Sequence, residues 1–139
     1  MAPRAPALYT PAILGAAASL ADFAWDESLP LKGDARSRSC GSAIAMALSI
    51  DAAGQVVRIG IRPHACAVGQ AAAHVFALHA SGLTRDEISG ARAGLAAWLS
   101  GEAPAPPWPG IELIAAARAY PARHGAILLA WDAALAALA

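Results

Sequence analysis

The sequence predicts an α+β fold, in which a small antiparallel β-sheet built on one hairpin packs against several helices. Residues 42–50 alternate larger apolar side chains, such as Ile44 and Met46, with smaller ones, as a half-buried strand does. A turn signal at 51–54 and a second β-rich run at 55–61 follow directly. These two runs predict the hairpin, and the segments before and after it have helical patterns.

The first half of the chain is expected to contain one helix before the hairpin. Thr10 is a candidate N-cap, and Pro11 occupies the first helical position, where its missing N–H costs nothing. The helix is expected to run to about Ala21 and to point Leu14 inward. Residues 26–39 are polar and predict a loop, with a short edge strand as the alternative.

The second half predicts three further helices. Residues 67–80 are helix-like, and Thr84–Glu87 form a capping box that begins another helix. The proline-rich residues 100–110 predict a linker. Residues 111–119 predict a helix, and 125–138 predict the last one. The side chains expected to face the core from the last helix are Leu128, Trp131, Leu135 and Leu138.

Length and composition indicate one domain spanning residues 1–139, with 1–7 as a loose tail. The charges of ten basic and ten acidic residues cancel, which argues against nucleic acid as a partner.

The chain is 58% apolar and 14% charged, which argues against disorder, and no apolar run is long enough for a membrane span. Prolines interrupt the N-terminal apolar stretch, so no signal peptide is expected. Two cysteines make no disulfide scaffold, and we expect a cytoplasmic protein.

The two cysteines are placed symmetrically about the predicted turn. Cys40 and Cys66 lie equally far from position 53, so an antiparallel hairpin brings them side by side at its open end. Two thiols there could share one metal ion, form a disulfide, or be small buried side chains. Cys66 also precedes a helix, whose N-terminus favours a thiolate. His64 points to the same side if its segment is extended, and His124 lies near the start of the last helix.

Four stretches of the chain have the order and spacing of motifs in one known family. Leu8–Leu14 is similar to its opening helix, and Cys40-Gly41 stands at the start of the hairpin, as its first Cys-Gly-Asp does. Cys66 opens a helix after the hairpin, like its second cysteine. Tyr120–Arg123, followed by Trp131, is similar to the stretch that leads into its third cysteine. The chain therefore resembles the IscU/NifU-like iron–sulfur cluster assembly scaffolds, and most closely the SufU branch, which has a similar proline-rich insertion.

The resemblance implies a SufE/IscU-like fold in which three cysteines and an aspartate surround a metal or a nascent cluster. It also implies a cysteine desulfurase as the partner that delivers persulfide sulfur to this site. IscU-like members assemble a [2Fe–2S] cluster, whereas SufU-like members hold zinc and accept sulfur.

Two of the four ligands that the resemblance implies are absent. Cys40 and Cys66 match the first two cysteines, but Ser42 stands at the position of the aspartate and Ala126 at that of the third cysteine. His124 is the nearest replacement. We therefore expect a degenerate site, in which Cys40 and Cys66 are thiolate ligands or persulfide carriers and His124 is an auxiliary metal ligand. Its expected cargo is zinc, iron or a transient [2Fe–2S] cluster.

Three functions remain open from the sequence. The first is a scaffold-like or sulfur-acceptor protein of iron–sulfur cluster assembly, which is not an enzyme in the strict sense. The second is a divergent family member without metal binding that acts as a desulfurase-binding or regulatory module. The third is a small thiol enzyme with Cys66 as nucleophile and His64 or His124 as base. The sequence does not determine the oligomeric state.

Overall fold

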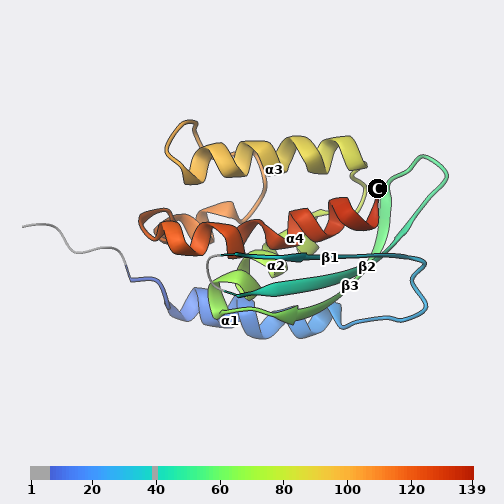
Figure 1. Ribbon diagram of the computed structural model, residues 1–139, viewed down its shortest axis with the longest axis horizontal. Helices are drawn as coiled ribbons and strands as arrows, with labels where there is room; N and C mark the ends of the chain where they lie inside the picture. Colours follow the sequence, from blue (N-terminus) through green and yellow to red (C-terminus); the bar gives the residue numbers. More distant parts are fainter. Residues whose placement is uncertain (1–6, 39–40) are drawn as a thin grey trace, which may run out of the picture.

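Three antiparallel strands in the order β1-β2-β3 form the sheet on which the helices pack (Figure 1). The structure is a computed structural model that describes residues 7–38 and 41–139, so the predictions for Cys40 fall outside the described residues. The strands are β1 (Leu31–Arg36), β2 (Ala43–Ile50) and β3 (Val56–His64). The α+β prediction is confirmed, and β2 and β3 form the predicted hairpin.

Two features of the sheet differ from the sequence prediction. Residues 26–39 were expected to be mainly a loop, but β1 occupies much of this stretch, so the edge-strand alternative is correct. β3 continues beyond residue 61, through Pro63 to His64. Proline is tolerated there because β3 is an edge strand, the kind of strand to which proline is largely confined.

The described part of the chain also contains four α-helices and three 3₁₀ helices. The α-helices are α1 (Pro11–Ser19), α2 (Ala67–His79), α3 (Arg85–Leu99) and α4 (His124–Ala137), and the 3₁₀ helices are η1 (Leu20–Phe23), η2 (Ile111–Ala119) and η3 (Pro121–Arg123). Both predicted caps are present: Thr10 Oγ1 accepts a hydrogen bond from the Ile13 N–H at 3.2 Å, and Thr84 and Glu87 form the capping box. The predicted inward orientation of Leu14 is wrong, since its side chain is half exposed. Helix α1 packs mainly on α2, so only one of its faces is covered. Among the described residues, no helix is long and apolar enough to cross a bilayer.

Helix α4 lies at the centre of the molecule, between the sheet and helix α3 (Figure 1). The predicted stripe is only partly correct, because Trp131 is fully buried whereas Leu128 and Leu135 are half-buried. A helix with neighbours on several sides buries most of its surface rather than one stripe. Its small side chains make this close packing possible, and the fully or nearly fully buried alanines of α4 are Ala126, Ala130, Ala133, Ala134 and Ala137.

The proline-rich linker is held to the core by one tryptophan. Trp108 stacks on Phe76, with ring centroids 5.6 Å apart and planes inclined by 12°. Its indole Nε1 donates a hydrogen bond to the Val75 carbonyl at 3.0 Å. Trp131 meets both rings edge-on, so three aromatic side chains join the linker, α2 and α4. The linker prediction for residues 100–110 is confirmed: Ser100 is the C-cap of α3, and residues 101–110 belong to no helix or strand.

Gly33 allows α4 to lie directly on β1, and its replacement provides a test of this packing. A Cβ atom at position 33 would stand 2.7 Å from the Ala136 carbonyl carbon and 2.8 Å from the Ala133 carbonyl oxygen. Because backbone atoms must then move, we expect Gly33→Ala to lower the free energy of unfolding by about 1–3 kcal/mol, measured by urea denaturation.

Gly90→Ala is the matched control. Gly90 is an exposed interior position of α3, and a Cβ atom there would have no neighbouring atom within 4 Å, so alanine should raise stability by about 0.5–1 kcal/mol. If both substitutions changed stability in the same direction and to the same extent, close packing at Gly33 would not be the cause.

Candidate functional site

Cys66 lies in a shallow hollow at the open end of the β2–β3 hairpin. The strand pairing extends to Ala43 opposite His64, and two residues later Cys66 is the N-cap of α2. The hollow has a volume of about 220 Å³. The residues that line it with Cys66 are Gly41, Ser42, His64, Ala65 and Arg123. The hairpin, α2 and the segment before α4 therefore meet at the thiol.

The Cys66 thiol is free and half-buried. Its backbone is extended, and its carbonyl accepts the Gln70 N–H at 2.9 Å, which closes the first turn of α2. The Gln70 side-chain amide donates to the Ala65 carbonyl at 2.9 Å and holds the chain just before the cysteine. The backbone of Cys66 is thus fixed at a helix N-terminus, where the helix dipole favours negative charge.

Ser37 and Gly41 lie on either side of residues 39 and 40, which are outside the described part of the chain. The Ser37 N–H donates to the Ser42 carbonyl at 2.8 Å, which joins the end of β1 to the start of β2. Gly41 has a φ of 70°, a left-handed conformation that suits glycine. Gly41 and Ser42 both border the hollow of Cys66. That the two cysteines are neighbours stays a prediction.

The two candidate histidines occupy different places. His64 is exposed at the end of β3 and borders the hollow. His124 begins α4, and its ring Nε2 lies 3.2 Å from the Arg118 carbonyl oxygen. The residue that reaches the hollow from this segment is Arg123, which precedes His124. Sequence reasoning assigned Arg123 no role, and its place in the Tyr120–Arg123 motif was the one signal for it.

The described donors of the hollow do not complete a tetrahedral metal site. Cys66 and His64 supply one thiol and one imidazole, whereas structural zinc sites use four protein ligands. Within residues 7–38 and 41–139, no group of three or more histidine, cysteine, aspartate or glutamate side chains is arranged to hold a metal ion.

Ala126, at the position that the resemblance gives to a third cysteine, is fully buried beside α2. A Cβ atom built at Gly69, in the first turn of α2, would be 3.4 Å from the Ala126 Cβ and 3.1 Å from that of Ala65. Position 126 therefore adjoins the same helix start as Cys66, but its methyl group has no ligand atom.

A second depression lies on the outer face of the sheet, next to the hollow. Two rows of residues cross the three strands in register and point to this face: Arg36, Ala43 and His64 in one row, and Asp34, Ala45 and Arg62 in the next. The depression has a volume of about 360 Å³, and we call it the outer trough. His64 borders both the outer trough and the hollow of Cys66.

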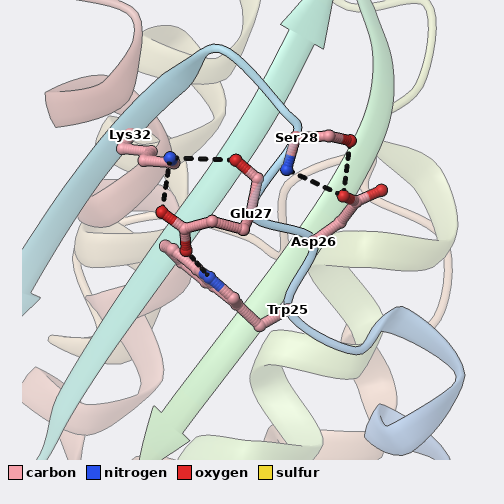
Figure 2. A network of polar contacts seen from close by, with 5 residues as sticks. All are labelled: Trp25, Asp26, Glu27, Ser28 and Lys32. Atoms are coloured by element: carbon pink, nitrogen blue, oxygen red, sulfur yellow. Dashed lines mark hydrogen bonds and ion pairs between the residues drawn. The ribbon is translucent and has the colours of Figure 1, made fainter.

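The loop that precedes β1 crosses the outer face of the sheet at Gly60, two residues before Arg62 along β3. It passes so close to Gly60 that a Cβ there would stand 2.8 Å from the Asp26 backbone nitrogen. Figure 2 shows this loop and the polar contacts that fix it. The Trp25 indole N–H donates to Glu27 Oε2 at 2.6 Å, and Lys32 Nζ donates to Glu27 Oε1 at 2.9 Å.

Both carboxylates of this loop are held in their charged form. Hydrogen bonds from Lys32 and then from Trp25 hold the pKa of Glu27 below its ordinary value. Hydrogen bonds from the side chain and backbone of Ser28 lower the pKa of Asp26. On the other side of Trp25, the Arg62 guanidinium carbon lies 4.1 Å from the indole ring centroid, a cation–π contact.

Two solved structures are similar to this chain over nearly its whole length. The NifU-like protein (N-terminal) from Brucella abortus superposes with a TM-score of 0.85 and 29% sequence identity, covering 94% of this chain and 92% of that one. SufU from the thermophile Fervidobacterium islandicum AW-1, assigned as an iron–sulfur cluster assembly scaffold for the SUF system, superposes with a TM-score of 0.80 and 21% identity. That match covers 95% of this chain and 97% of that one.

Comparison at the level of sequence finds no related family or curated protein. No protein-family model matches the chain, and no curated protein matches it with significance.

The Glu27 contacts predict a pH-dependent stability difference. Because the pKa of Glu27 is lowered by folding, its contribution to stability is complete above the unfolded value of about 4.5 and is lost as the pH falls through the lower folded value. We expect Glu27→Gln to melt at a lower temperature than the parent chain near neutral pH. The two melting temperatures should converge as the pH falls through the lowered pKa that Glu27 has in the folded chain.

Glu102→Gln controls for the loss of one negative charge, because the Glu102 carboxylate has no hydrogen-bond or ion-pair partner among the described residues. A melting-temperature difference for Glu27→Gln that stayed constant with pH, or that Glu102→Gln reproduced, would contradict the assigned contacts.

Proposed function

This chain shares the fold of the IscU/NifU-like family near its SufU branch, and from that premise we propose that it is a scaffold-like or sulfur-acceptor protein of iron–sulfur cluster assembly. The observation that carries the proposal is the half-buried, free Cys66 thiol at the N-terminus of α2. It stands in a hollow that Gly41 and Ser42, the residues after Cys40, also border.

The surroundings of Cys66 suit a nucleophilic sulfur that becomes a persulfide. The thiol stands at the N-terminus of α2, and a basic residue, Arg123, lines the same hollow; such surroundings are typical of reactive cysteines. In the transfer, the Cys66 thiolate attacks the terminal sulfur of a persulfide on the donor protein. A new S–S bond forms at Cys66 as the donor's S–S bond breaks, and the donor cysteine leaves as a thiolate. The reaction needs no other oxidant or reductant.

The proposed partner is a cysteine desulfurase, which supplies the persulfide, and the proposed location is the cytoplasm, where thiols stay reduced. We propose Cys40 as the second thiol of the site. With His124 as auxiliary ligand, Cys40 and Cys66 form the proposed donor set for zinc, iron or a transient [2Fe–2S] cluster. Because His124 Nε2 contacts the Arg118 carbonyl, Nδ1 is the ring nitrogen that would join this set.

A desulfurase-binding or regulatory module without metal binding is the second candidate. Ala126 favours it, because a buried methyl group occupies the position of the third cysteine. Both candidate functions use the same fold and the same surface around Cys66. They differ in whether Cys66 and its neighbours bind sulfur or a metal.

Sulfur acceptance is tested by incubating the protein with a cysteine desulfurase and free cysteine, then measuring the mass of each cysteine-containing peptide. We expect Cys66 to gain one sulfur atom, and Cys66→Ser to reduce the total sulfur gained by about tenfold or more, because the attacking thiolate is absent. Circular dichroism checks that the variant is folded. Equal sulfur uptake by Cys66→Ser would remove the role given to this thiol.

Restoring the missing ligand tests the metal site. If Cys40 and Cys66 are neighbours, Ala126→Cys adds a third thiolate beside them, and the zinc affinity measured by chelator competition should rise by about tenfold or more. Ala134→Cys, two turns further along α4 and equally buried, is the control and should bind zinc like the parent chain. Equal affinities in both variants would count against a metal site and favour the second candidate.

A further inference from the structure

The outer trough has the form of a binding groove for an extended peptide. Its floor is the middle strand β2, which presents only the small side chains of Ala43 and Ala45. Arg36 stands on β1 on one side, and Arg62 and His64 stand on β3 on the other. Neighbouring strands are roughly 4.8 Å apart, so the two walls rise about 10 Å from each other. That width accommodates one extended chain whose side chains reach both walls.

The outer trough carries two arginines against one carboxylate, because the two acidic groups of the loop beside it are paired elsewhere. Glu27 is bound to Lys32 and Trp25, and Asp26 is bound to Ser28 and lies 3.7 Å from Arg58. Among the described residues, Arg36 and Arg62 have no carboxylate within ion-pair distance. Asp34 is the one carboxylate that lines the trough, on the β1 side.

Arg62 is held in position before any ligand arrives. Its guanidinium carbon stands over Trp25 at a centroid distance of 4.1 Å, and the Trp25 indole is itself fixed by Glu27, which Lys32 holds in turn (Figure 2). Stacking uses the face of a guanidinium and leaves its N–H edge available for a carboxylate. An ordered arginine loses less conformational freedom on binding than a mobile one.

The outer trough leads to Cys66 at one end. His64 lines both the trough and the hollow, whereas in the opposite direction along β3 the loop before β1 covers Gly60. A peptide that lies along the trough therefore extends to the thiol.

We propose that the outer trough binds an extended acidic segment of the sulfur-donating protein, with carboxylates on Arg62 and Arg36, and so brings the donor persulfide to Cys66. This inference rests on the proposed sulfur-acceptor function and adds the chemistry by which the donor is recognised. Asp34 sets the register, because an acidic side chain placed against it would be repelled.

The test is an NMR titration of the isotope-labelled whole chain with an eight-residue peptide of alternating glutamate and alanine. We expect saturable shifts of the Ala43 and Ala45 amides and of the Trp25 indole N–H. Arg62→Glu should weaken binding about tenfold, because it replaces attraction by repulsion. Arg62→Lys keeps the charge but loses the planar guanidinium that stacks on Trp25, and it should weaken binding about threefold.

Arg85→Glu is the matched control, since Arg85 is exposed at the start of α3 and makes the same change in net charge. It should bind the peptide within about twofold of the parent chain. Absence of saturable shifts in the parent chain, equal weakening by both glutamate variants, or equal binding of a lysine–alanine peptide at the same residues would each overturn the proposal.

The same titration with Cys66→Ser separates this inference from the proposed function. Peptide binding does not use the thiol, so it should be unchanged in that variant. If sulfur acceptance is intact but peptide binding is unaffected by substitution of Arg62, only the proposed role of the outer trough is contradicted. Sulfur acceptance that survives Cys66→Ser contradicts only the role of the thiol.

Discussion

The antiparallel pairing of β2 with β3 is the constraint on which the candidate site depends. It extends to Ala43 and His64, and by doing so it brings the residue before β2 and the residue after β3 to one end of the sheet. Cys66 follows two residues later and caps α2, so a thiol, a helix N-terminus and the loop that contains Gly41 converge there. A register shifted by one residue would also turn the alternating side chains of β2 to the wrong face.

Small residues let the rest of the molecule close around that end. Gly33 permits α4 to rest on β1, and Gly69 permits α2 and the start of α4 to approach each other at Ala126. On the outer face, the alanines of β2 leave a depression rather than a ridge. An alanine-rich sequence therefore does more here than fill a core, because its small side chains set how closely the helices approach and where the surface is hollow.

The polar contacts of the loop before β1 connect the fold to the surface that faces the proposed partner. Lys32 holds Glu27, Glu27 holds Trp25, and Trp25 supports Arg62. All four side chains are at least partly exposed, so each contact by itself contributes little to stability. Their combined effect is positional: they occupy the nearby carboxylate and leave an arginine free to bind another.

Local signals in the sequence determined the hairpin, the caps at Thr10 and Thr84, the linker and the position of Cys66 before a helix, because strand alternation and capping act over a few residues. Tertiary structure alone decided what depends on distant partners. β1 forms because β2 offers its edge and α4 covers its glycine, and α4 has no single stripe because it has neighbours on several sides. Arg123 rather than His124 borders the hollow, and Arg36 and Arg62 flank the same stretch of β2, because packing sets the orientation of such side chains.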